Sequence, residues 1–258
     1  MEKQGIFYVE YGEGKPVVLL PGFCETHEVW KNIASELSKD YRVICPDLPG
    51  FGESQKMETV TLELVAHKLY EWMVSLELES PALVGHSMGG YITLELVRQH
   101  PEFLSGFALF HSSAFADKRD KRILRTKAIH LVEKHGAANV LSGFIHGLFY
   151  EGNHDRLAAV IEELNQIVRK TTDESYVDYA RAIREREPSI AVLRDFKGPK
   201  LFIAGAEDLA VPVEDSRKQI ASVPEMDALV LENVGHMGMF EAPEACIKSL
   251  RSFLDKTR

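Results

Sequence analysis

The sequence has 258 residues, 45% of them hydrophobic and 27% charged, which excludes a mainly disordered chain, a collagen and a disulfide-rich mini-scaffold. Its 39 acidic and 30 basic side chains give a net charge of −9, which argues against a nucleic-acid binder and against adhesion to anionic membranes. The cysteines, Cys24, Cys45 and Cys246, form neither a disulfide framework nor a zinc motif. Because the sequence shows no membrane-spanning run and no signal peptide, it predicts a cytoplasmic protein.

Short apolar runs alternate with helical patterns in the first part of the chain. The runs are rich in branched or aromatic side chains and are followed by turn residues, which is typical of strands buried on both faces of a parallel sheet. One intervening pattern, from Leu62 to Leu76, has apolar residues at spacings of three and four, and Thr61 can cap its start. This alternation predicts an α/β fold. The predicted strands are residues 17–20, 41–45, 82–85 and 107–110.

The alternation stops at about Ala114, where a helical segment of roughly 75 residues begins. Asp173 is the expected N-cap of its last helix, and Pro188 ends the segment. We expect this insertion to be a packed helical lid that divides the chain into residues 1–113, 114–188 and 189–258. Its predicted helices are residues 121–134, 137–149, 154–169 and 174–187, and the α/β pattern then returns with strands at 200–204 and 228–231 and helices at 213–221 and 243–254.

The strongest chemical signal is Gly85-His-Ser-Met-Gly89, which fits the pattern G-x-S-x-G. It lies between a predicted strand and a helix predicted over residues 88–99, which is the setting of a nucleophile elbow. Small residues are needed there because a serine at a sharp turn has a strained backbone. The sequence therefore predicts Ser87 as the nucleophile.

A serine nucleophile needs a base, and the base needs an acid that orients it. His236 follows the predicted strand at 228–231, and Asp208 follows the one at 200–204. Both would lie at the edge of the sheet where Ser87 lies, and the chain order serine, aspartate, histidine is that of this class of fold. Glu207, next to Asp208, is the main alternative for the acid.

An oxyanion needs backbone donors. The N–H of Met88, at the start of a helix, is one candidate, and the N–H of Phe23, in the loop after the first buried strand, is the other.

These residues identify a resemblance to the α/β-hydrolase superfamily, in its lid-bearing group of small esterases, enol-lactonases and carbon–carbon bond hydrolases. The resemblance implies an α/β-hydrolase fold, with a mostly parallel sheet flanked by helices and an inserted helical lid. One departure is Pro21, where family members usually have histidine, which leaves the side-chain hydrogen bonding of the oxyanion loop open. The matching segments are residues 19–23, 47–54, 85–90, 205–208 and 235–236, and we interpret 47–54 as a structural turn.

Several further residues are candidates for substrate contact: Cys24 beside the oxyanion loop, His111 after a strand, and Phe144 and Phe149 in the predicted lid. Leu148 and Tyr150 add to the apolar character of that segment. The histidines of the lid lack paired metal-ligand spacing, and no nucleotide-binding motif is present, so we expect neither a metal nor another cofactor. These histidines are His130, His135, His146 and His154.

The predicted function is a serine hydrolase that cleaves a small or medium carboxylic ester, lactone or thioester through an acyl-enzyme on Ser87. Its expected partner is a small acyl substrate, with no nucleic acid and no membrane. Two alternatives stay open: carbon–carbon bond hydrolysis or lyase chemistry with the same triad, and a ligand sensor of slow turnover. The sequence does not determine the oligomeric state.

Overall fold

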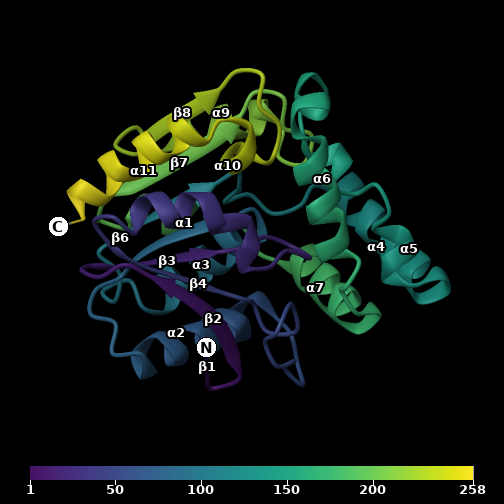
Figure 1. Cartoon of the computed structure of the whole chain (residues 1–258), viewed down its shortest axis with the longest axis horizontal. Helices are drawn as coiled ribbons and strands as arrows, with labels where there is room; N and C mark the ends of the chain where they lie inside the picture. Colours follow the sequence, from purple (N-terminus) through teal and green to yellow (C-terminus); the bar gives the residue numbers. More distant parts are fainter. Residues whose placement is uncertain (258) are drawn as a thin grey trace.

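An eight-stranded sheet forms the centre of the protein, in the order β1-β2-β4-β3-β5-β6-β7-β8, in a computed structural model that describes residues 1–257 (Figure 1). The strands from β4 across to β8 are parallel, whereas β2 is antiparallel to β4 and β1 is antiparallel to β2. The strands are β1 (Glu2–Lys3), β2 (Ile6–Tyr11), β3 (Pro16–Leu20), β4 (Arg42–Pro46), β5 (Ala82–His86), β6 (Gly106–Phe110), β7 (Lys200–Gly205) and β8 (Asp227–Leu231).

The predicted strands are all present, and the prediction missed β1 and β2. The central strands β5, β6 and β7 are buried along their whole length, so each is a continuous apolar run. Strand β2 instead alternates buried and half-buried residues near the edge of the sheet, and β1 is exposed. A search for continuous apolar runs therefore passes over both.

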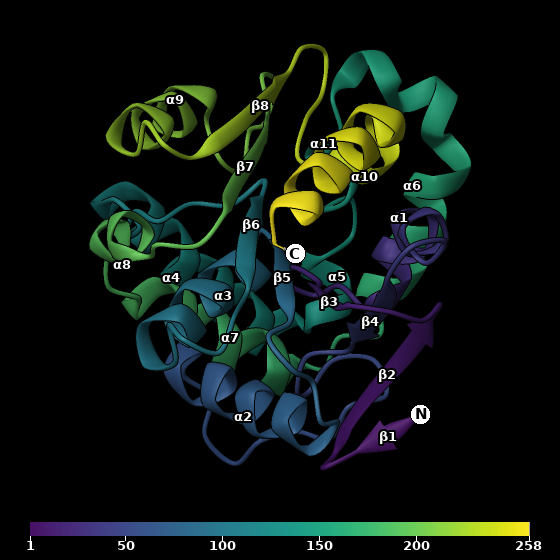
Figure 2. The same cartoon turned by 90° about the vertical axis from the view of Figure 1, so that its left-hand side faces the viewer.

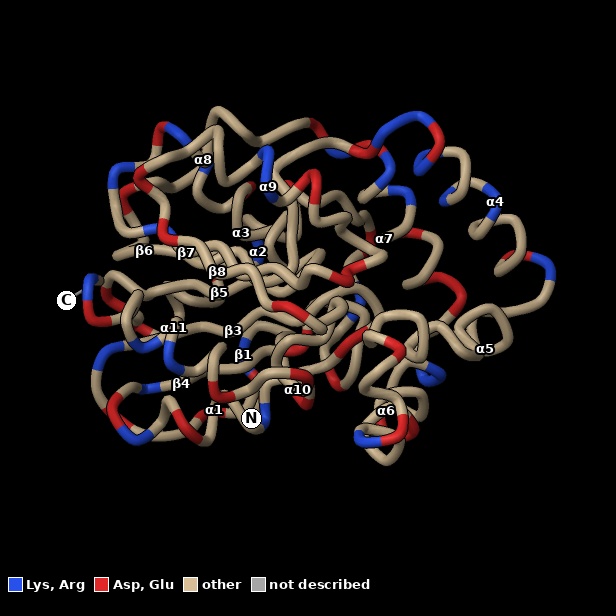
Figure 3. Tube along the Cα trace, turned by 90° about the horizontal axis from the view of Figure 1, so that it is seen from above, with Lys and Arg blue, Asp and Glu red and all other residues tan. Residues whose placement is uncertain are grey.

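Helices cover the two faces of the sheet (Figure 3). On one face lie α1 (Lys31–Leu37), which follows the short helix η1 (His27–Trp30), and α11 (Pro243–Lys256). On the other face lie α2 (Leu62–Ser75), α3 (Met88–Gln99), α8 (Ile190–Asp195) and α9 (Val213–Ser222). Thr61 caps α2 as predicted, because its side chain accepts the N–H of Leu64. The prediction missed α1, α8 and the short α10 (Gly238–Glu241).

Four of the helices between β6 and β7 form an insertion that lies at one end of the sheet (Figures 1 and 2). The N–H of Ser189 donates to the carbonyl of Ala114 at 2.7 Å, so the two ends of the insertion meet. This contact lies next to the predicted boundaries, which themselves stay a prediction. The inserted helices are α4 (Arg119–His135), α5 (Ala137–Val140), α6 (His154–Val168) and α7 (Asp173–Glu185), with short turns η2 (His146–Leu148) and η3 (Glu151–Asn153) between α5 and α6.

Two expectations for the insertion are wrong. Residues 137–149 do not form one helix, because α5 ends at Val140 and Gly143 has a φ of +80°, in the left-handed region. Asp173 does not cap α7, because Thr172 does so by accepting the N–H of Ser175. The carboxylate of Asp173 instead accepts the N–H of Ala137 at 2.6 Å and so caps the start of α5.

Within residues 1–257, no helix is both long enough and apolar enough to cross a membrane. The three cysteines are buried free thiols.

Candidate active site

Ser87 lies at a sharp turn between β5 and α3. Its φ is +49° and its ψ is −114°, a conformation that is rare for a residue with a side chain. A Cβ on Gly85 would lie 2.4 Å from the backbone of Gly89, and one on Gly89 would lie 2.6 Å from the carbonyl oxygen of Pro21. Both positions therefore require glycine, and the turn packs directly on the loop after β3.

Asp208 and His236 form a hydrogen-bonded pair at the same end of the sheet. His236 Nδ1 lies 2.7 Å from Asp208 Oδ2, and both side chains are buried. Asp208 Oδ1 accepts the N–H groups of Ala210 and Val211, each at 2.8 Å. Burial alone would raise the pKa of the Asp208 carboxyl, but His236 and His111 outweigh burial and hold that pKa well below its usual range.

The neighbouring carboxylate, Glu207, is exposed, and its backbone N–H donates to Val234. The structure therefore places the acid next to His236 at Asp208 and not at Glu207.

The loop that carries His236 is fixed by a buried residue that sequence reasoning missed, Glu241. One oxygen of Glu241 accepts the N–H groups of Gly235 and Met237, and the other accepts the N–H of Tyr150 from the insertion. The N–H of His236 also donates to the carbonyl of Leu148 at 2.7 Å. The inserted segment thus helps to hold the loop of the histidine. In the sequence, the sign that could have pointed to this role is a glutamate shortly after His236.

A second carboxylate that the sequence analysis missed, Glu25, organises the predicted oxyanion loop. Its Oε2 accepts the N–H of Gly22 at 2.6 Å and also lies 2.8 Å from His86 Nδ1. The Nε2 of His86 lies 3.0 Å from the carbonyl oxygen of His236. Glu25 therefore supplies a side-chain acceptor in a loop where Pro21 has none, and through His86 it connects this predicted oxyanion loop to the loop of His236.

His86 is fully buried, and both of its ring nitrogens face acceptors. An imidazolium with a proton on each nitrogen satisfies both. Burial works against this charged form, but Glu25 outweighs it and raises the pKa of His86 above its usual value.

If the predicted oxyanion loop serves ester hydrolysis, we expect Glu25→Ala to lower kcat by about 100-fold, because misplacing an oxyanion donor costs about as much as losing one. Glu25→Gln keeps an acceptor for Gly22 but removes the charge that balances His86, and we expect a loss of about tenfold. Steady-state kinetics measure both losses. Glu28→Gln, an exposed change in the same segment, is the matched control. Wild-type kcat in Glu25→Ala would contradict this role.

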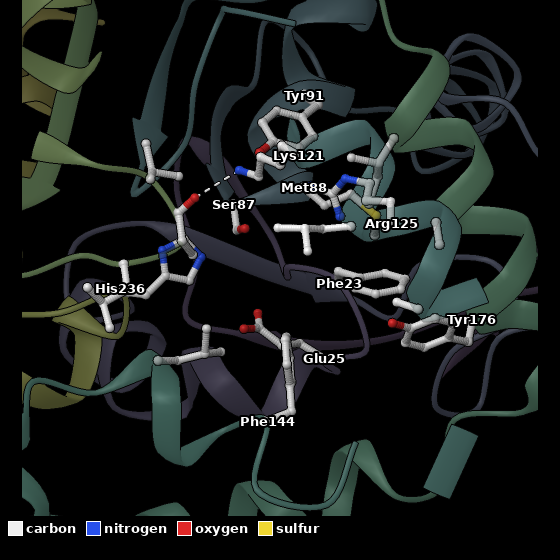
Figure 4. A pocket seen from close by; sticks show the side chains of 18 residues that line it. Phe23, Glu25, Ser87, Met88, Tyr91, Lys121, Arg125, Phe144, Tyr176 and His236 are labelled. Carbon is white, nitrogen blue, oxygen red and sulfur yellow. Dashed lines mark hydrogen bonds between the residues drawn. The ribbon is translucent and has the colours of Figure 1, made fainter. Parts of the chain in front are cut away.

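A cavity of about 300 Å³ lies between the sheet and the inserted helices and contains Ser87 and His236 (Figure 4). Of the predicted substrate-contact residues, Phe144 lines it. Phe23 contributes its ring, which packs against Tyr176 of α7 at 5.0 Å between centroids. The remaining lining residues are Glu25, Met88, Tyr91, Lys121, Leu124, Arg125, Ala128, Leu148, Ala180, Ile183, Leu209, Ala210 and Val211.

Three of the predicted contact residues do not line this cavity. Cys24 is buried with a φ of +64° and lines a separate hollow beside Thr171, where burial raises the pKa of its thiol. Phe149 is buried and packs near Phe240. His111 lies in the core, with Nδ1 3.3 Å from Asp208 Oδ2. All three side chains are buried among other residues and are not available to a substrate in this cavity.

His111, Asp208 and His236 have ligand atoms within 4.8 Å of one another, the one such group among residues 1–257. All three side chains are buried and hydrogen-bonded within the group. The expectation that no metal is needed stays a prediction.

The burial of His111 makes stability depend on pH. Burial lowers its pKa to about 4, although Asp208 acts in the opposite direction. In the unfolded chain His111 becomes protonated below about pH 6.5. In the folded chain it becomes protonated only below about pH 4. The contribution of His111 to the unfolding free energy should therefore fall by about 3 kcal/mol between these pH values and stay constant below them.

Urea unfolding at pH 7 and pH 4.5 measures this fall. His111→Asn should reduce it, because asparagine tolerates the φ of +47° and carries no titrating ring. His130→Asn, on the exposed side of α4, is the control and should leave the pH dependence unchanged. An equal pH dependence in His111→Asn would show that His111 is not the group responsible.

Comparison with known proteins agrees with this architecture. A family model described as "alpha/beta hydrolase fold" matches residues 15–243. The chain is 28% identical to the uncharacterized hydrolase YugF of Bacillus subtilis, over 96% of this chain and 94% of that one. It is 25% identical to the 2-hydroxy-6-oxo-6-(2'-aminophenyl)hexa-2,4-dienoic acid hydrolase of Metapseudomonas resinovorans, over 96% and 87% of the two chains.

Among solved structures, a thermophilic esterase from Thermogutta terrifontis with malate bound has a TM-score of 0.92 and 29% identity, covering 98% of this chain and 93% of that one. The enol-lactonase from Burkholderia xenovorans has a TM-score of 0.87 and 22% identity, covering 97% and 96%, which shows a shared fold. Since the family model spans most of the chain, the protein belongs to the α/β-hydrolase family and is a hydrolase of that fold.

Proposed function

We propose that the protein is a serine hydrolase that cleaves a small or medium carboxylic ester, lactone or thioester through an acyl-enzyme on Ser87. The observation that carries this proposal is the shared cavity. Ser87, on its strained turn, and His236, paired with Asp208 at 2.7 Å, both line it. The 29% identity to an esterase over nearly the whole chain supports the ester as the substrate class.

In the proposed mechanism, Ser87 attacks the carbonyl carbon while His236 takes the hydroxyl proton. Asp208 holds the proton of His236 on Nδ1, so that Nε2 is free to act as the base. The N–H groups of Phe23 and Met88 stabilise the oxyanion, and His236 then returns the proton to the leaving group. Water repeats the cycle on the acyl-enzyme and releases the acid.

The inserted helices act as a lid in this proposal. Phe144 and Leu148 line the cavity from the insertion, together with Ala180 and Ile183 of α7. A mainly apolar wall of this kind suits the carbon chain of an acyl group. Because Leu148 also accepts the N–H of His236, the position of the lid and that of the base are coupled.

Carbon–carbon bond hydrolysis is the second candidate, favoured by the 25% identity to a hydrolase of a hexadienoic acid derivative over most of both chains. The same serine, histidine and aspartate would serve that reaction, so the residues of the site do not discriminate between the two.

A substrate panel combined with a fluorophosphonate label tests the proposal. We expect multiple turnover on ethyl esters of short acids and stoichiometric labelling at Ser87, located by mass spectrometry of the peptide. Turnover of a vinylogous 1,5-diketone acid without any turnover of esters would favour the second candidate. Labelling at another residue would contradict both.

A further inference from the structure

Two cationic side chains line the cavity that contains Ser87. Lys121 and Arg125 are one helical turn apart on α4, so they project from the same face of that helix into the cavity (Figure 4). Much of the remaining lining is apolar. A charged group in such a lining is costly unless it is paired or has a ligand. The charges of these two residues therefore require an explanation.

Pairing within the protein accounts for only part of this charge. Arg125 donates from Nε to Asp117, and its two terminal nitrogens donate no hydrogen bond to any of residues 1–257. The amino group of Lys121 donates to the carbonyl of Ala210 at 2.9 Å and lies 3.8 Å from Asp117. Asp117 is also paired with Arg186 at 2.9 Å. One carboxylate thus faces three cations, which leaves an excess of two positive charges.

The third cation, Arg186, does not line the cavity but lies next to a residue that does. The guanidinium of Arg186 lies 4.0 Å from the centre of the Tyr91 ring, and Tyr91 itself lines the cavity. Arg186 therefore adds to the positive potential on this side without contacting a ligand.

The acidic residue of the lining does not cancel this potential. Among the described residues Glu25 is the one carboxylate that lines the cavity, and it is paired with His86 at 2.8 Å. In the view of Figure 4 it lies on the opposite side of the Ser87 hydroxyl from Lys121 and Arg125. The protein as a whole carries a net charge of −9, whereas α4 carries a cluster of basic residues (Figure 3). This local reversal of sign favours anionic ligands in the cavity.

We propose that the substrate carries a carboxylate, bound by Lys121 and Arg125, while its ester carbonyl lies at Ser87. This inference rests on the proposed function and narrows its substrate class to two kinds of ester. One is a monoester of a dicarboxylic acid, and the other is an ester formed at the hydroxyl group of a hydroxy acid. The free fork of Arg125 is suited to a carboxylate, which can accept two parallel hydrogen bonds from it. The apolar lining accommodates the carbon chain between the two groups.

The first experiment compares matched substrates on the wild-type protein. Monoethyl esters of the C4 to C8 dicarboxylic acids are paired with the corresponding terminal amides, which have the same shape and no charge. Acetate esters of hydroxy acids and of their amides place the carboxylate on the alcohol side instead. We expect kcat/KM to favour the acid over its amide by tenfold or more in one series, mainly through KM, with an optimum chain length.

The second experiment tests the two cations. Lys121→Gln and Arg125→Gln should each reduce the acid-to-amide ratio of kcat/KM by about tenfold. Arg122→Gln is the matched control, because Arg122 is on the same helix, pairs with Glu185 at 2.9 Å and does not line the cavity. Should Arg125→Gln fail to fold, Lys121→Gln and the wild-type comparison still decide the result.

Each outcome has a distinct meaning. If the amides and acids of both series react equally while Ser87 is labelled and neutral esters are cleaved, this proposal is wrong and the proposed function stands. If no ester of any kind is cleaved and Ser87 is not labelled, the proposed function fails instead. An acid preference that persists unchanged in both Gln variants would overturn the assignment to Lys121 and Arg125.

Discussion

Ser87→Ala should abolish ester turnover, lowering kcat by about 10⁶. The substitution removes one oxygen from a half-buried residue, so folding and the cavity should persist. Without that oxygen no acyl-enzyme can form, and only the oxyanion donors and substrate binding remain, which are worth about 10³ to 10⁴ over the rate in water. Labelling by a fluorophosphonate should be lost together with turnover.

Ser112→Ala is the matched control for this experiment. The hydroxyl of Ser112 donates to the backbone carbonyl of Ser87 at 2.7 Å, so its removal perturbs the turn but leaves the nucleophile in place. We expect a loss of no more than about tenfold, the cost of one hydrogen bond. Equal losses in the two variants would mean that distortion of the turn, and not the missing nucleophile, explains the effect of Ser87→Ala.

The same variant separates an enzyme from a ligand sensor. A sensor with this fold would need the cavity and the inserted helices but not the oxygen of Ser87. Ser87→Ala should therefore bind substrate with near wild-type affinity in either case, and a biological output that survives the substitution would favour the sensor.

The parts of the fold that the sequence predicted are those whose local pattern agrees with their tertiary role. Helix α3 begins and ends at the predicted residues because its start is fixed by Ser87, and strands buried on both faces are continuous apolar runs. Strand β2 and helix α1 are only partly buried or short, so their patterns are weaker. The helix predicted over residues 137–149 was wrong because the prediction ran through Gly143, a poor helix former whose φ of +80° is not helical.

The site shows the same division. Serine, aspartate and histidine each follow a strand, so the topology of a parallel sheet places them at one edge. The contacts of Glu25, Glu241 and Asp117 depend on loops and on the insertion, whose packing has no short-range signature. His111 follows a strand as Asp208 does, yet its φ of +47° accompanies a side chain in the core. Asp208 pairs with His236 at the cavity, whereas His111 does not line it, and this difference appears only in the folded structure.

Asp208→Asn should lower kcat by about 10⁴, and the structure indicates why. Oδ1 accepts two backbone N–H groups, from Ala210 and Val211, so the amide oxygen of the asparagine must occupy that position. Its NH₂ group then replaces Oδ2 and faces Nδ1 of His236, which lay 2.7 Å from Oδ2. Because the NH₂ group is a donor, Nδ1 must accept and the proton moves to Nε2, where His236 can no longer act as a base.

The N–H groups of Ala210 and Val211 fix the orientation of the asparagine side chain. They prevent the side-chain amide from flipping, so the tautomer of His236 with its proton on Nδ1 is not restored. Glu207→Gln is the matched control, because it changes the adjacent carboxylate, which is exposed, and should alter kcat by less than about threefold. Steady-state kinetics at pH 8 and thermal unfolding of both variants give the comparison, and we expect Asp208→Asn to remain folded. A larger loss of kcat in Glu207→Gln than in Asp208→Asn would show that the acid is Glu207, with Asp208 serving only to hold the loop.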